Sequence, residues 1–157
     1  MAESSEPPHK QRTVVVGVLW NKAGEVLLCK MKPDRGVFPD QWGLPGGGMH
    51  VGETMIEALE RELEGELGLR VSHIEPAFFK DGFYRKLLPG GDMIPMYIIF
   101  LVFNCRAEST TIRLNEEFSE YRWVKPGDLN TLDINEVTLD TLTKAAGYYQ
   151  RSRQNLP

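Results

Sequence analysis

Residues 42–70 read WGLPGGGMHVGETMIEALERELEGELGLR, a run of glycines followed by an acidic segment with helical periodicity. Residues 53–67 show the strongest helical pattern of the chain, and Gly68 stands just past its end, where glycine often terminates a helix. The apolar arc that we expect to face the core consists of Ile56, Leu59, Leu63 and Leu67. The stretch therefore predicts a glycine-rich loop that leads directly into an amphipathic helix.

Glu66 breaks the amphipathic pattern of this helix. At about 100° per residue it falls inside the apolar arc, and Glu62 lies at the edge of the arc one turn earlier. A carboxylate aimed at a core loses hydration, which is costly unless a positive charge compensates it. Residues 53–66 hold six glutamates and one arginine, which sum to a charge of −5. The pattern indicates either a site for a hard divalent cation or a slightly rotated helix with solvated glutamates.

The remainder of the chain predicts one mixed α/β domain without internal repeats. The strands that we expect from apolar and β-branched runs are residues 13–20, 25–31, 71–85, 96–105 and 121–124, the first two forming a hairpin. Residues 133–136 resemble a capping box ahead of a final helix. We expect a domain over residues 13–150, with a disordered segment at 1–12 and a polar tail at 151–157.

Composition limits what this domain can do. The chain has 157 residues and a net charge of −4, which disfavours nucleic-acid binding through phosphate neutralisation. Its two cysteines, Cys29 and Cys105, lie far apart, so neither a disulfide framework nor a zinc-binding spacing is indicated. Neither a signal peptide nor an apolar run long enough to span a bilayer is recognisable. We therefore expect a cytoplasmic protein that binds neither nucleic acid nor membrane.

The glycine-rich loop and the helix together resemble the Nudix box of the Nudix hydrolases. The spacing of that signature is matched by Gly47, five residues, Glu53, seven residues, Arg61-Glu62-Leu63, two residues, Glu66, one residue, and Gly68-Leu69. So long a signature is far more specific than a single glycine motif. The resemblance implies the Nudix α/β/α sandwich, in which a mixed β-sheet lies between helices and the box forms a loop–helix–loop.

The resemblance also implies roles for the residues of the box. Glu66 and the carbonyl of Gly46 are the implied ligands of Mg²⁺, for which Mn²⁺ can substitute, and Glu62 is a second ligand or the general base. Arg61 is expected to orient Glu62 through a charge-assisted hydrogen bond. Gly47 is expected to let the backbone approach the metal and the phosphates closely.

Further candidates lie outside the box. Glu117, six residues before Trp123, stands where related enzymes place a distal metal-binding or catalytic carboxylate, and Glu116 is the alternative. Lys30 is a candidate phosphate contact, although an exposed strand lysine explains it almost as well. Asn135 matches a position at which relatives contact the base, and capping of the final helix is the alternative.

The box departs from the family pattern at one position. Relatives usually have two consecutive glutamates where this chain has Gly65 and Glu66. The missing carboxylate is often a metal ligand, and glycine also costs a helix about 1 kcal/mol relative to alanine. Either fewer magnesium ions bind, or water or Glu117 fills the vacant position.

The resemblance extends beyond the box and implies a substrate class. Residues 28–31, 34–39, 115–118 and 121–126 resemble bacterial nucleoside triphosphatases of the NudI type, and the likeness covers approximately residues 12–146. It implies hydrolysis of (deoxy)nucleoside triphosphates, with a preference for pyrimidine deoxynucleotides, to the monophosphate and pyrophosphate. The partner is then a small nucleotide, and a homodimer is compatible with the sequence.

Two other functions stay open at this point. Residues 65–70 also resemble the end of the box in GDP-mannose hydrolases, which indicates a sugar-nucleotide hydrolase. Those enzymes lack the glutamate found here as Glu62, and they use a histidine near the distal acidic motif, where this chain has Phe118. The other alternative is a non-catalytic nucleotide-binding module that lost its chemistry with the first glutamate of the pair.

Overall fold

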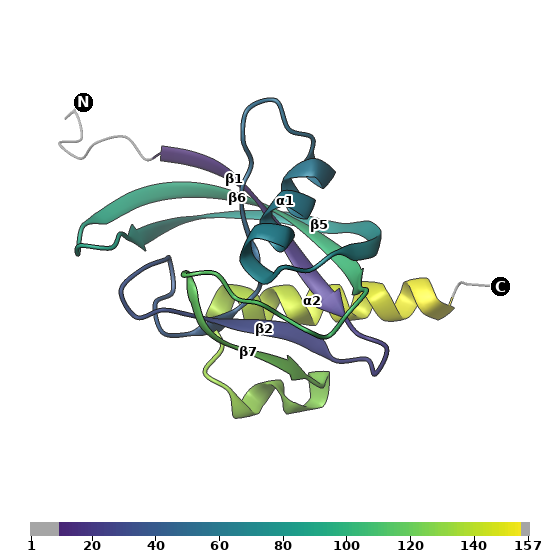
Figure 1. Ribbon diagram of the computed structural model, residues 1–157. Coiled ribbons are helices and arrows are strands. Elements are labelled where there is room, and N and C mark those ends of the chain that lie inside the picture. The colour runs from purple at the N-terminus through teal and green to yellow at the C-terminus, as the bar shows by residue number, and fades with distance from the viewer. Residues whose placement is uncertain (1–9, 155–157) are drawn as a thin grey trace.

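The computed structural model describes residues 10–154, with side chains as far as Ala145. Within that range, helices α1 (Met55–Leu67) and α2 (Glu136–Gln154) cover opposite faces of a mixed β-sheet (Figure 1). The strands are β1 (Lys10–Trp20), β2 (Val26–Met31), β3 (Trp42–Gly43), β4 (Gly46–Gly48), β5 (Val71–Leu87), β6 (Met93–Ala107) and β7 (Phe118–Val124). A short 3-10 helix, η1 (Pro126–Thr131), precedes α2. The arrangement is the predicted α/β/α sandwich.

The sheet divides into two arms that diverge from one turn. In the first arm β1 pairs in parallel with β6 along its whole length, and β6 pairs antiparallel with β5. In the second arm β2 pairs antiparallel with β3 and β7. Strands β1 and β2 pair only where Trp20 meets Val26, so the predicted hairpin is confined to its turn. Beyond that pair β1 and β2 separate, as Figure 1 shows.

Alternation along β1 explains why this strand is apolar on both faces. Val15 and Leu19 belong to the core that α1 covers, where they join Leu63. Val18 belongs to the core on the other face, where it joins Leu142 of α2. Because successive side chains of a strand point to opposite faces, the part of β1 that is covered on both faces, residues 14–20, carries no polar side chain, whereas residues 10–13 are polar and mostly exposed. The sheet therefore carries two cores, one under each helix.

The expected ends of the domain differ from the structure, and β5, β6 and β7 extend two or three residues beyond their expected bounds. β1 begins at Lys10 because residues 10–12 pair with β6, so the end of the expected N-terminal segment belongs to the sheet. Residues 1–9 lie outside the described residues. At the other end α2 continues to Gln154, because no proline or glycine interrupts the helix after Gly147. The first residues of the predicted polar tail therefore lie in α2, and residues 155–157 lie outside the described part of the chain.

The helix starts also differ in detail. A capping box of Thr54 and Glu57 begins α1, and Ile56 is 36% exposed because the first turn does not yet face the core. The cap of α2 is Asn135, whose side-chain oxygen accepts a hydrogen bond from the Thr138 N–H at 2.7 Å. The capping box expected to start at residue 133 is therefore wrong, because the helix begins three residues later. No helix of the described residues is long and apolar enough to cross a membrane.

We expect Leu63→Ala to lower the free energy of unfolding by about 3 kcal/mol, the usual cost of a cavity in a tight core. Leu63 is fully buried and lies over Gly17, where an added Cβ would be 3.4 Å from its Cδ2. Urea denaturation measures the loss. The matched control is Leu139→Ala on α2, because Leu139 is 47% exposed. Equal losses in the two variants would contradict the assigned core.

Candidate active site

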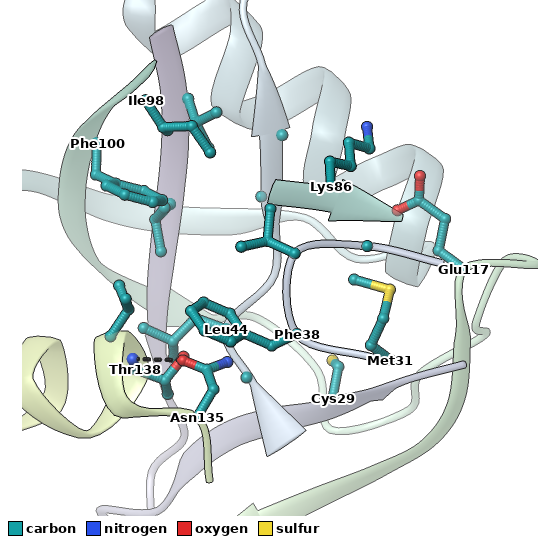
Figure 2. A pocket seen from close by; sticks show the side chains of 18 of the residues that line it. Cys29, Met31, Phe38, Leu44, Lys86, Ile98, Phe100, Glu117, Asn135 and Thr138 are labelled. Atoms are coloured by element: carbon teal, nitrogen blue, oxygen red, sulfur yellow. Dashed lines mark hydrogen bonds between the residues drawn. The ribbon is translucent and has the colours of Figure 1, made fainter. Parts of the chain in front are cut away.

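The space between the two arms of the sheet holds a cavity of about 430 Å³. Figure 2 shows its two ends: Phe38, Leu44, Phe100, Asn135 and Thr138 gather at one, and Lys86 and Glu117 lie at the other. The glycines of β4 and Glu62 of α1 also line it. A cavity of this size with an apolar end and a charged end suits a small amphipathic anion.

The inward direction of Glu66, predicted from the helical pattern, is confirmed. The residue is only 2% exposed, and its Oε1 accepts a hydrogen bond from the Gly46 N–H at 2.9 Å. Its Oε2 is buried without a hydrogen-bond partner among the described residues. Burial, then the neighbouring carboxylates of Glu117 and Glu62, raise the pKa of Glu66 well above its usual value. The charged form of this side chain therefore needs a cation beside it.

Arg61 connects the helix of the box to its glycine-rich segment. Its guanidinium donates to both carboxylate oxygens of Glu53, at 2.5 and 2.9 Å. It also donates to Oε1 of Glu62 at 2.8 Å and to the carbonyl of Gly48 at 3.0 Å. The bond from Arg61, with a second from the His50 N–H, lowers the pKa of Glu53 to about 2. Arg61 thus orients Glu62, as predicted, and its donors are used inside the protein.

Gly47 allows α1 to approach β4 closely. A Cβ at this position would lie 2.5 Å from the carboxylate carbon of Glu62, so any side chain here would displace that carboxylate. The segment Gly46–Gly48 is not the plain loop that its composition indicated. It pairs antiparallel with Val14, Val15 and Val16 of β1, which fixes the Gly46 N–H toward Glu66.

The distal carboxylate of the cavity is Glu117. Glu117 lines the cavity, whereas Glu116 is exposed and does not. The Glu117 N–H donates to the side chain of Asn115 at 3.0 Å, and the Asn115 N–H donates to the Glu66 carbonyl at 3.0 Å. These two bonds tie the turn before β7 to the end of α1. They explain how Glu66 and Glu117, about fifty positions apart in the sequence, become neighbours.

Lys30 does not line the cavity, contrary to the expectation that it contacts phosphate. It forms ion pairs with Asp40 at 3.7 Å and Glu120 at 3.9 Å, and its side chain is 28% exposed. Cys29 and Met31, its neighbours on β2, both line the cavity. Alternation along the strand therefore turns Lys30 away from the cavity, and its side chain is half-buried between two carboxylates.

Asn135 lines the cavity and also caps α2. Its Oδ1 is occupied by the Thr138 N–H, and its Nδ2 donates to the Trp42 carbonyl at 3.2 Å. A side-chain amide has two N–H donors, so one donor stays available to a ligand. The two interpretations of Asn135 are therefore compatible.

The sequence analysis missed three cationic residues of the cavity, Arg12, Arg35 and Lys86. They come from β1, from the connection between β2 and β3, and from the end of β5. No common motif joins these segments. The pairing of β1 with β6 and of β6 with β5 brings Arg12 and Lys86 to one cavity, and a β-bridge between Gly36 and Leu87 adds the segment of Arg35.

The oxygen donors at the charged end fit a hard divalent cation. Glu62 and Glu117 line the cavity, and Glu66 is buried near both without lining it. The partnerless Oε2 of Glu66 is the group that most needs such a charge. Within residues 10–145 no three His, Cys, Asp or Glu side chains form a preformed metal cluster. Gly65 leaves open space on α1, so no protein atom replaces the missing box carboxylate at that position.

Comparison with known proteins agrees with this geometry. The model of the NUDIX domain matches residues 10–144. The nucleoside triphosphatase NudI of Enterobacter sp. (strain 638) is 46% identical over 137 residues, which cover 86% of this chain and 96% of that protein. NudI of Klebsiella pneumoniae (strain 342) is 44% identical over 137 residues, with the same coverage of 86% and 96%.

Solved structures share the fold. The MutT protein from Methanosarcina mazei Go1 superposes with a TM-score of 0.69 at 19% identity and covers 97% of this chain and 100% of its own. The NUDIX domain of Shewanella oneidensis NrtR, complexed with ADP ribose, superposes with a TM-score of 0.72 at 18% identity, covering 92% and 94%. These likenesses confirm the predicted sandwich fold.

The raised pKa of Glu66 makes the stability of the metal-free protein depend on pH. In the folded state Glu66 keeps its proton to a higher pH than in the unfolded chain, where its pKa is near 4.5. Between those two values the folded state binds more protons, so the free energy of unfolding falls as the pH rises. We expect the thermal midpoint of the natural protein in a chelator to fall, relative to that of Glu66→Gln, as the pH rises above about 5.

The control for this measurement is Glu60→Gln, because Glu60 is exposed on the same helix. It should retain the pH dependence of the natural protein. Parallel curves for the natural protein and Glu66→Gln would show that the Glu66 carboxyl is not the group responsible.

Proposed function

The chain belongs to the Nudix hydrolase family, and on that basis we propose that it is a Mg²⁺-dependent pyrophosphohydrolase of nucleoside triphosphates. The products are the nucleoside monophosphate and pyrophosphate. Relatives named nucleoside triphosphatase, 46% and 44% identical over 86% of the chain, support this substrate class. The observation that carries the proposal is the buried Glu66, whose partnerless Oε2 lies near two further carboxylates. Such a site needs a divalent cation, and a polyphosphate needs the same ion.

We assign the metal to the carboxylates of Glu62, Glu66 and Glu117 and to the carbonyl of Gly46. When bound, Mg²⁺ neutralises phosphate charge and makes water more acidic. Glu62 is the general base of the proposal: Arg61 occupies its Oε1, which leaves Oε2 to accept a proton from the attacking water. Gly47 supports this role, because its lack of a side chain lets the Glu62 carboxylate lie against β4.

The other end of the cavity receives the nucleoside. Phe38, Leu44 and Phe100 provide apolar surface there, and Asn135 offers one amide N–H to the base. The polar groups at this end, among them Thr138, are uncharged, which suits a neutral base. A preference for pyrimidine deoxynucleotides is the part of the proposal that rests on the resemblance alone.

Replacement of the inner carboxylates tests the catalytic assignment. We expect Glu62→Gln and Glu66→Gln each to lower turnover by about 10² to 10⁴, because each removes a base or a metal ligand while preserving shape. Pyrophosphate release from a nucleoside triphosphate in Mg²⁺ measures the rate. Glu60→Gln, on the exposed face of α1, is the matched control and should keep its activity. Near-normal rates in both active-site variants would refute the assignment.

A substrate panel separates this function from its alternatives. The panel contains purine and pyrimidine triphosphates and GDP-mannose, each with Mg²⁺, and pyrophosphate is scored against orthophosphate and free mannose. Pyrophosphate from the triphosphates supports the proposal. Mannose release would favour a sugar-nucleotide hydrolase, and tight binding without turnover would favour a non-catalytic module.

The vacant box position offers a gain-of-function test. Gly65 lies in α1, and an added Cβ there meets open space, so a longer side chain fits without rearrangement. We expect Gly65→Glu to bind Mg²⁺ several-fold more tightly, measured by calorimetry, because it adds a carboxylate near the others. Gly65→Gln is the control, since it restores about the same helix propensity without the charge. Equal affinities in the two variants would show that the position lies outside the metal site.

A further inference from the structure

Arg12 and Lys86 are cationic side chains at the charged end of the cavity that have no ion-pair partner among the described residues. The third cation there, Arg35, is paired with Asp34 at 3.0 Å. If Arg12 and Lys86 served to neutralise the carboxylates of the site, they would pair with them. They are instead available to an anion that enters the cavity.

Arg12 is positioned by Gly48. A side chain at Gly48 would overlap the guanidinium of Arg12, so the guanidinium occupies the space that the glycine leaves. The carbonyl of the same glycine accepts a hydrogen bond from Arg61. The charge of Arg12 is therefore held against β4, one residue from the Gly47 that supports Glu62.

Lys86 is positioned by a β-bridge between the end of β5 and the connection between β2 and β3. The Gly36 N–H donates to the Leu87 carbonyl and the Leu87 N–H donates to the Gly36 carbonyl, both at 2.9 Å. These bonds tie the end of β5 to the connection between β2 and β3. Lys86, which precedes Leu87, therefore lies beside the cavity at the end that holds Glu117 (Figure 2).

We infer that Arg12 and Lys86 bind the pyrophosphate part of a nucleoside triphosphate, the two phosphates beyond the bond that is cleaved. This inference rests on the proposed function. Water forms a new oxygen–phosphorus bond, the first anhydride bond breaks, and its electron pair leaves with pyrophosphate, which the two cations bind as they bind the same two phosphates of the substrate. The same contacts make the site select triphosphates over diphosphates, because a diphosphate lacks the outermost phosphate.

Steady-state kinetics and direct binding test the inference together. We expect Arg12→Gln and Lys86→Gln each to raise KM for a triphosphate about tenfold, the effect of losing one charge-assisted contact, with kcat changed much less. Calorimetry with inorganic pyrophosphate and Mg²⁺ should show a similar loss of affinity. Arg12→Lys should recover part of it, because it retains the charge. Kinetic constants for a nucleoside diphosphate should change less than those for the triphosphate.

The matched controls are Lys10→Gln on β1 and Arg85→Gln on β5, neighbouring cations that do not line the cavity. Unchanged KM and unchanged pyrophosphate affinity in Arg12→Gln and Lys86→Gln would overturn the inference. The proposed function would still stand if the natural protein hydrolysed triphosphates. If the natural protein hydrolysed no triphosphate, the proposed function would be refuted. The pyrophosphate titration would still show whether Arg12 and Lys86 bind pyrophosphate. Loss of binding in the two variants alone would support the subsite, and unaltered binding would refute it.

Discussion

The buried carboxylate of Glu66 is the constraint on which the site depends. A charge with 2% exposure and one partnerless oxygen is tolerated only where fixed donors and a cation compensate it. The Gly46 N–H is one such donor, and it is aimed correctly because the glycine segment pairs with β1 as a strand. The pairing of β4 with β1 therefore fixes the position of Glu66 on α1, and with it the place of the proposed metal.

The divergence of β1 and β2 creates the space in which this arrangement can act. Had the two strands continued as a hairpin, side chains would fill the region that is now a cavity of about 430 Å³. On the edges where the two strands separate, β1 pairs with β4 and β2 pairs with β3, so backbone hydrogen bonding continues there. The separated arms bring a carboxylate end and an apolar end into one pocket, which is the division that a nucleotide requires.

The cations of the site differ in whether they bond to other groups of the protein. Arg61 donates hydrogen bonds to Glu53, Glu62 and the Gly48 carbonyl, so it orders groups of the protein and does not serve to bind a ligand. Arg12 lies on the other side of that same glycine without an ion-pair partner in the described part of the chain. Gly48 thus contacts both the arginine that orients Glu62 and the arginine for which we propose a contact with phosphate.

The sequence alone was sufficient for what depends on local periodicity. Helical spacing identified the inward Glu66 and placed Glu62 at the edge of the apolar arc, because residues within a few turns of one helix have a fixed relation. The role of Arg61 was implied by the resemblance to the Nudix box. The resemblance led to the pair at 116 and 117, and the structure decided that Glu117 faces the cavity.

Tertiary structure decided what depends on which strands pair. Lys30 was predicted as a phosphate contact and is turned away, since the face of β2 that borders the cavity is set by the opening between distant strands. Arg12 and Lys86 could not be found from sequence, because they share no spacing and meet only through β1, β6 and β5. Periodicity is a local property that can be read from the sequence. The register and the partner of each strand depend on contacts between distant segments, which form only when the sheet packs around its two cores.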